Sequence, residues 1–417
     1  CNSITALFIM WILYHIAIVL ITSVCSRVLA DEPRVFCYFS SWATYRKGYG
    51  KFDVDDIDPF LCTHVVYAFT GLDPKTNKIK PLDPYNDLEE NWGKGSFLKF
   101  TNLTLKNEAL KVIIGIGGWN EGSAKYSKMA SVKESRQSFI TSCVELIKRY
   151  NFSGLDLDWE YPGNREGSKP EDKKNFVKLL SETKAEFSKY GYLLTGAVSA
   201  GQSTIDTAYN IPEISRYFDI INIMTYDYHG SGWESFTGHN TPLYSGPQDD
   251  GHDVKLNVNY SINYWLSHGA PKDKLTLGLA FYGQSYTLAN KSNHEFYSPI
   301  SGKGQKGIHT RLPGYLGYNE ICEKLDISEK DKWTVYRDKH YRAPYMVSGN
   351  QFVSYDDAES ISEKVAFAKA HGLSGVMVWS IETDDFHGRC HYGVKNPLLT
   401  TINQRLGRRI RKPKFRA

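Results

Sequence analysis

The sequence has no short internal repeat and no low-complexity tract, which excludes a solenoid and argues against a largely disordered chain. No cysteines have the close spacing of a zinc site, and no Gly-x-Gly-x-x-Gly motif follows a predicted strand. We therefore expect neither a structural zinc nor a dinucleotide site. Aromatic residues are abundant instead, with 28 Tyr, 20 Phe and 9 Trp among 417 residues. Aromatic rings pack in cores and also stack on the apolar faces of sugars.

No Lys or Arg precedes the apolar stretch at residues 4–25. Small residues follow it in the pattern that signal peptidase cleaves, so we predict a signal peptide over residues 1–30 that is removed after Ala30. An uncleaved membrane anchor is the alternative, because the stretch is long enough to span a bilayer. A secreted protein would carry glycans at Asn-x-Ser/Thr sequences. These sequences stand at Asn102, Asn151, Asn259 and Asn290.

Acidic residues are absent from the segment 405–417, which holds seven of the 50 Lys and Arg residues. The remainder of the chain has 43 basic against 46 acidic residues, so its formal net charge is −3 rather than the +4 of the whole. Because residues 1–404 are so close to neutral, we expect no nucleic-acid-binding face on this part of the chain. We expect residues 405–417 to form a disordered basic tail.

Short β-branched runs alternate with amphipathic stretches from Val35 to Ile381. Eight buried strands separated by helices favour an α/β fold, a closed (β/α)8 TIM barrel, over an open doubly wound sheet. The connection at 284–355 is too long for a loop and predicts a small inserted α+β domain between strands seven and eight, within a catalytic domain over 31–404. The predicted strands are 35–40, 63–69, 111–118, 154–160, 193–200, 220–227, 275–282 and 375–381, and helical spacing is clearest at 133–149, 171–189, 257–268 and 357–371.

Three carboxylates recur at every second position of the fourth strand, at Asp156, Asp158 and Glu160. Side chains two residues apart share one face of a strand, about 6.6 Å from each other. Inside a barrel, desolvation and mutual repulsion of three carboxylates would cost roughly several kcal/mol, a cost that a purely structural role does not explain. The alternative, a solvated edge strand with its polar residues turned outward, would need a face open to water, which the interior of a barrel does not offer. Crowded carboxylates raise each other's pKa. Glu160 is nearest the open end of the strand, so we predict that it is a general acid.

Residues 155–162 (LDLDWEYP) resemble the signature of glycoside hydrolase family 18, which contains chitinases and chitinase-like lectins. The resemblance runs from about Arg34 to Leu406, and the mixed pattern looks most like the arthropod chitinases. Its other motifs are Cys37-Tyr38-Phe39 with Trp42, Gly117-Gly118-Trp119, Met224-Thr225-Tyr226-Asp227, Phe281-Tyr282-Gly283-Gln284-Ser285 and Val378-Trp379.

This resemblance implies endo-acting hydrolysis of β-1,4-linked N-acetylglucosamine polymers with retention, in which the acetamido group of the substrate is the nucleophile. It assigns proton donation to Glu160, and support of the acetamido group to Asp158, paired with Asp156, and to Tyr226. It implies no metal and no organic cofactor. The sugar-binding residues that it implies are Tyr38, Trp42, Phe69, Gly118, Trp119, Ala197, Met224, Asp227, Trp233, Tyr282 and Trp379.

Two positions depart from the family pattern. Ser153 stands where an acidic residue is usual, at the closed end of the fourth strand, and the stretch 229–233 is one residue longer than usual. The longer stretch leaves open where Trp233 lies.

We predict a secreted, extracellular monomeric chitinase whose partners are chitin and chitooligosaccharides, with no nucleic acid and no membrane contact after signal cleavage. One alternative is a catalytically weak or inactive lectin on the same fold, although such members typically lack the acid that Glu160 provides. Another is an enzyme that cleaves N-glycan cores.

Five cysteines remain after signal removal, so four are expected to pair. Cys37 and Cys62 lie on or beside neighbouring strands, whereas Cys322 belongs to the insertion and Cys390 lies towards the chain end. We predict the disulfides Cys37–Cys62 and Cys322–Cys390, with Cys143 free on a helix.

Overall fold

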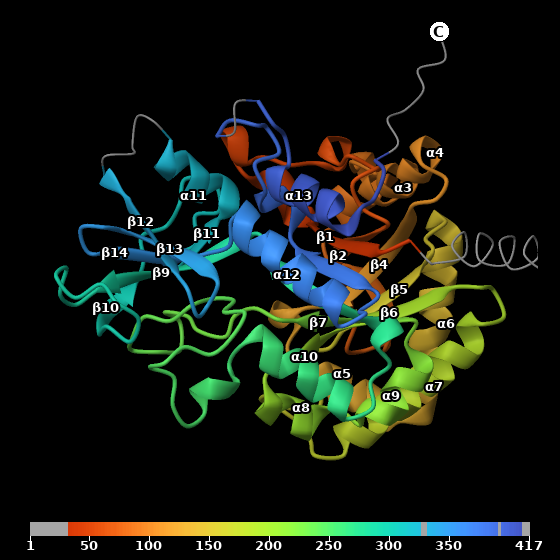
Figure 1. Cartoon of the computed structure of the whole chain (residues 1–417). Helices are drawn as coiled ribbons and strands as arrows, with labels where there is room; N and C mark the ends of the chain where they lie inside the picture. The colour runs from red at the N-terminus through yellow and green to blue at the C-terminus, as the bar shows by residue number, and fades with distance from the viewer. Residues whose placement is uncertain (1–31, 327–331, 391–392, 411–417) are drawn as a thin grey trace, which may run out of the picture. The chain divides into compact units, whose positions relative to one another are not determined.

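Eight parallel strands close into a barrel in the computed structural model, which describes residues 32–326, 332–390 and 393–410 (Figure 1). Their order is β1-β15-β8-β7-β6-β5-β4-β2, and β1 also pairs with β2, which closes the ring. The predicted (β/α)8 barrel is therefore confirmed. The strands are β1 (Arg34–Ser40), β2 (His64–Leu72), β4 (Lys111–Gly117), β5 (Gly154–Asp158), β6 (Leu193–Ser199), β7 (Ile220–Met224), β8 (Leu275–Ala280) and β15 (Gly375–Trp379).

Helices follow the strands and bury one face against them. The four segments with the clearest helical spacing form α6 (Lys133–Tyr150), α7 (Asp172–Phe187), α10 (Val258–Ser267) and α12 (Ala358–Ala370). The other described helices are α2 (Pro84–Asp87), α3 (Ser96–Thr101), α4 (Leu103–Lys106), α5 (Ala124–Ser131), α8 (Gln202–Ala208), α9 (Ile211–Tyr217), α11 (Tyr318–Leu325) and α13 (Pro397–Leu406), and the short strand β3 (Ile79–Pro81) pairs with β2.

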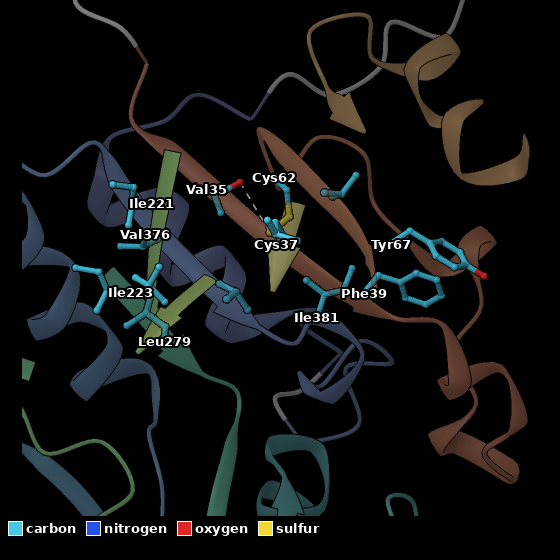
Figure 2. Close-up of a cluster of buried hydrophobic side chains, with 14 of the residues drawn as sticks. Val35, Cys37, Phe39, Cys62, Tyr67, Ile221, Ile223, Leu279, Val376 and Ile381 are labelled. Carbon is cyan, nitrogen blue, oxygen red and sulfur yellow. Dashed lines mark hydrogen bonds between the residues drawn. A yellow bond between two sulfur atoms is a disulfide. The ribbon is translucent and has the colours of Figure 1, made fainter. Parts of the chain in front are cut away.

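The alternation of side chains along each strand divides the core into two parts. Val35, Cys37 and Phe39 of β1 belong to the large cluster between strands and helices (Figure 2). Phe36 and Tyr38 of the same strand belong to a separate cluster inside the barrel. A side chain's parity on its strand therefore decides whether it supports the fold or faces the barrel interior.

The long connection between β8 and β15 forms a second, six-stranded sheet (Figure 1). Its strand order is β10-β9-β14-β13-β12, with β11 paired to β9, and it has its own aromatic core around Tyr286 and Phe352. The predicted inserted α+β domain is confirmed. Its strands are β9 (Tyr282–Leu288), β10 (Ile300–Lys303), β11 (Tyr315–Gly317), β12 (Thr334–Asp338), β13 (Ala343–Ser348) and β14 (Gln351–Ser354).

Both predicted disulfides are present, and Figure 2 shows Cys37–Cys62 between β1 and the segment before β2. Cys143 is free and buried on α6, as predicted.

The expected start of the basic tail at residue 405 is too early. Helix α13 continues through Arg405 to Leu406, and the guanidinium of Arg408 donates to the carbonyl oxygen of Leu61 at 3.1 Å. The end of α13 thus packs on the segment before β2. The predicted signal peptide and residues 411–417 lie outside the described residues. Within the described ranges, no helix is long and apolar enough to cross a membrane.

Candidate active site

Strand β5 places carboxylates inside the barrel. Its outward residues, Leu155 and Leu157, are buried in the core beneath the helices. Asp156 and Asp158, between them, are almost wholly buried on the opposite face. Glu160 follows the end of the strand and is half-buried at the mouth of the barrel. The three carboxylates therefore run from the interior to the surface, as the alternation predicts.

The two inner carboxylates form a hydrogen-bonded pair. Asp156 accepts hydrogen bonds from the hydroxyl of Tyr38, at 2.6 Å, and from that of Thr195. Asp158 accepts the backbone N–H of Ala197 at 2.9 Å. Burial raises the pKa of both acids, and the neighbouring charge of Asp156 raises the pKa of Asp158 further. Because Asp156 has the donors that stabilise a carboxylate, its pKa is raised less than that of Asp158.

The outer carboxylate is tuned differently. Burial raises the pKa of Glu160 to about 7, and the nearby charge of Asp227 adds to that rise, whereas Tyr161 and Arg165 oppose it. A substantial fraction of Glu160 thus carries a proton at neutral pH, as a general acid requires.

An open cleft of about 900 Å³ surrounds Glu160. It is lined by Glu160, Asp158 and Tyr226 and by all eleven predicted sugar-binding residues: Tyr38, Trp42, Phe69, Gly118, Trp119, Ala197, Met224, Asp227, Trp233, Tyr282 and Trp379. Asp156 lies below the cleft and does not line it. The sequence thus predicted which side chains share one cavity, although they come from separate strands and from the inserted sheet.

Aromatic rings floor this cleft. The Trp379 ring stacks on Phe69 with centroids 5.8 Å apart and lies 5.4 Å from Tyr38. Gly118 makes room for this group: a Cβ there would lie 2.6 Å from the Phe69 ring, and the backbone has φ +80°. Trp42 and Trp119 are 45% and 60% exposed, so their rings are accessible to a ligand along the cleft.

On the opposite side, Tyr226 and Asp227 follow β7. The Tyr226 hydroxyl approaches the sulfur of Met377 at 3.6 Å, and burial raises its pKa well above the ordinary value, so it remains a neutral donor. The amide of Gln284 donates to Asp227 at 2.8 Å. Gln284 and Arg165 were not among the predicted site residues. Gln284 belongs to the family motif Phe281–Ser285, but no spacing in the sequence indicated a role in the site for either residue.

The lengthened stretch 229–233 folds back on itself. The Trp233 ring covers Gly230, where a Cβ would lie only 2.3 Å from a ring carbon. Glu234 fixes the turn, because its carboxylate contacts the imidazole of His229 at 2.9 Å and accepts the N–H of Gly230 at 3.0 Å. Trp233 is 59% exposed and lines the cleft despite the extra residue.

Ser153, the other departure, lies at the base of β5, where its hydroxyl accepts the N–H of Val112 at 3.1 Å. It therefore serves the hydrogen bonding between β4 and β5, far down the strand from Glu160.

Among the expected glycan acceptors, Asn102, Asn151 and Asn290 are exposed. Asn259 is half-buried in α10, and the hydroxyl of Ser261 in its acceptor sequence is buried and hydrogen-bonded to Ala200.

Comparison with known proteins gives consistent results. Residues 34–384 match the family described as glycosyl hydrolases family 18. The probable chitinase 2 of Drosophila melanogaster is 47% identical over 366 residues, which cover 85% of this chain and 73% of that protein.

Solved structures are similar over the same part of the chain. The Group IV chitinase of Ostrinia furnacalis superposes with a TM-score of 0.86 at 46% identity, over 90% of this chain and all of that one, and it has also been solved in complex with allosamidin. Human YKL-39, described as a pseudo-chitinase with retained chitooligosaccharide binding properties, has a TM-score of 0.82 at 35% identity, over 90% of this chain and 100% of that one.

Proposed function

The chain belongs to the glycosyl hydrolases of family 18 and hydrolyses chitin, and we propose that it does so with Glu160 as proton donor and with retention of the anomeric configuration. The observation that carries this proposal is the graded row of carboxylates on β5. Burial raises the pKa of Asp156, it raises that of Asp158 more strongly, and it raises that of Glu160, inside an aromatic-lined cleft, to about 7.

In the first step, Glu160 gives its proton to the glycosidic oxygen as the bond from that oxygen to C1 breaks. The acetamido oxygen of the same sugar forms a bond to C1, which gives an oxazolinium ring. Asp158 accepts the acetamido N–H, and the negative charge of the hydrogen-bonded Asp156–Asp158 pair offsets the developing positive charge. Such a substrate-assisted route needs no carboxylate nucleophile, which accords with the deep burial of Asp158.

In the second step, the Glu160 carboxylate takes a proton from water as the water oxygen attacks C1. The ring opens and the acetamido group is restored. Two displacements at C1 give the β-anomer. In this proposal, the neutral hydroxyl of Tyr226 donates to the acetamido oxygen, and the Trp379 ring stacks on the sugar that reacts.

The open cleft supports attack within a chain rather than at its end. Three exposed tryptophans line it, Trp42, Trp119 and Trp233, and they offer an extended sugar chain more than one ring on which to stack. We propose that the substrates are polymeric chitin and longer chitooligosaccharides. The two disulfides support a secreted, extracellular protein.

The stereochemical course tests the mechanism. Proton NMR of chitohexaose hydrolysis at early times should show the β-anomer as the first product, and a thiazoline analogue of the oxazolinium should inhibit. Cellulose lacks the acetamido group and should not be cleaved. The α-anomer as first product would exclude the double displacement.

A further inference from the structure

Arg165 lies in the loop between β5 and α7 and joins two parts of the cleft. One of its guanidinium nitrogens donates to the backbone carbonyl of Glu160 at 3.1 Å and to that of Trp119 at 2.6 Å. The guanidinium carbon also lies 3.7 Å from the centre of the Trp119 indole ring, within the range of a cation–π contact. A single side chain therefore contacts the residue that carries the acid and the residue that carries an exposed aromatic platform.

The loop holds Arg165 in place without any help from a ligand. The Ser168 hydroxyl accepts the N–H of Arg165 at 2.9 Å and donates to its carbonyl oxygen at 2.5 Å. Gly163 and Gly167 have φ of +68° and +79°, and a Cβ on Gly167 would lie 2.5 Å from that of Ala124. The loop is thus pinned to the start of α5, and the arginine is oriented before substrate arrives.

One face of the Trp119 ring is covered by the guanidinium, yet the residue is 60% exposed. The opposite face is therefore the accessible one. Without the arginine, the indole would lose the contact that selects this orientation, since its ring is otherwise largely in solvent.

The arginine also contributes a positive charge beside Glu160. The titratable groups around that carboxyl are Asp158 on the same strand, Tyr161 in the loop after it, Tyr209 after α8, and Tyr226 with Asp227 after β7. Burial and Asp227 raise the pKa of Glu160, and Arg165 holds it lower than these two effects alone would set it.

We propose that Arg165 is a positioning residue that sets the orientation of the Trp119 platform and the electrostatic environment of Glu160 together. It coordinates sugar stacking with proton donation, although it touches neither the substrate's reacting atoms nor the transferred proton. This inference rests on the proposed role of Glu160.

Two substitutions separate the contributions of Arg165. Arg165→Met keeps roughly the length of the side chain and removes the charge. The fall of kcat/KM at high pH, its alkaline limb, reports the loss of the Glu160 proton and should therefore move to higher pH. Because the contact with the Trp119 ring is also lost, KM for chitohexaose should rise about threefold to tenfold. Arg165→Lys keeps the charge and loses the planar group that bridges two carbonyls, so KM should rise while the limb stays in place.

A double-mutant cycle with Trp119→Ala identifies the route of the KM effect. In the Trp119→Ala background, Arg165→Met should raise KM no further but should still move the alkaline limb. Arg216→Met is the matched control, because it removes one charge from an exposed arginine of α9 that pairs with Glu213. It should change neither quantity.

An unmoved alkaline limb in Arg165→Met, or a KM effect that is equally large with and without Trp119, would overturn the inference. Melting temperatures show whether each variant is folded. If Arg165→Met is unfolded, the same double-mutant cycle is run with Arg165→Lys, and the inference then stands or falls on whether the KM effect of Arg165→Lys disappears in the Trp119→Ala background. Glu160→Gln distinguishes the two levels of the argument. If that variant remains active, the proposed function fails; if it is inactive and the Arg165 limb is unmoved, only the present inference fails.

Discussion

Raising the pH should inactivate the protein through Glu160. With a pKa of about 7, about nine-tenths of Glu160 is protonated at about pH 6 and about one-tenth at about pH 8, so kcat/KM should fall roughly tenfold across this interval. With the ordinary pKa of a glutamate, near 4.5, only about 3% would be protonated at about pH 6. Burial thus increases the active fraction there about thirtyfold.

The assay is the pH profile of kcat/KM for chitohexaose, since this ratio reports the free enzyme. Asp227→Asn provides a second check. The charge of Asp227 raises the pKa of Glu160, so its removal should move the alkaline limb to lower pH, whatever it does to the maximal rate. A limb near pH 4.5 in the wild type, or a limb in Asp227→Asn that moves upward, would refute the electrostatic reasoning.

Four further predictions follow from named contacts. Trp379→Ala should lower kcat/KM for chitohexaose about a hundredfold, because it removes the ring that floors the site; a loss below threefold would contradict this. The unfolding free energy of Glu160→Gln should rise relative to that of the wild type by about 1 to 3 kcal/mol as the pH increases from about 4.5 to 7, because the folded wild type disfavours the ionised carboxylate. Urea unfolding at several pH values should show that the two proteins become equally stable at low pH. Replacing Cys37 and Cys62 together by serine should cost about 3 kcal/mol of unfolding free energy, since the bond closes a loop of 25 residues; an unchanged denaturation midpoint would count against the bond. A chain that ends at Ile410 keeps α13 and its contact with the barrel, so its turnover of chitotetraose should equal that of the full chain, and a tenfold loss would show that the tail reaches the cleft.

The sequence predicted best what depends on periodicity. The barrel strands alternate between a helix-facing core and an inner face, so the parity of Asp156, Asp158 and Glu160 was enough to place them together. Tyr38 and Trp379 came instead from the family resemblance, and the structure places both in the cluster inside the barrel. Family motifs supplied the rest of the cleft. The disulfide Cys37–Cys62 followed from the positions of two neighbouring strands, and Cys322–Cys390 from those of the insertion and the chain end.

Loop contacts were beyond such reasoning. Arg165 reaches Trp119 because its own loop turns at two glycines, and no period in the sequence marks that turn. Likewise, Trp233 folds over Gly230 within a stretch whose altered length obscured its place. The start of the basic tail was misjudged because Arg408 is held by a carbonyl 347 positions away along the chain, which composition alone cannot reveal.

The most direct test of the central claim is the turnover of chitohexaose by Glu160→Gln beside that of Glu166→Gln. Glutamine keeps the shape of Glu160 but has no proton to give, whereas Glu166 is exposed in the following loop and serves as the matched control. We predict that Glu160→Gln loses about a thousandfold or more in kcat while still binding the oligosaccharide, and that Glu166→Gln behaves as the wild type. Hydrolysis by Glu160→Gln at the wild-type rate would contradict it.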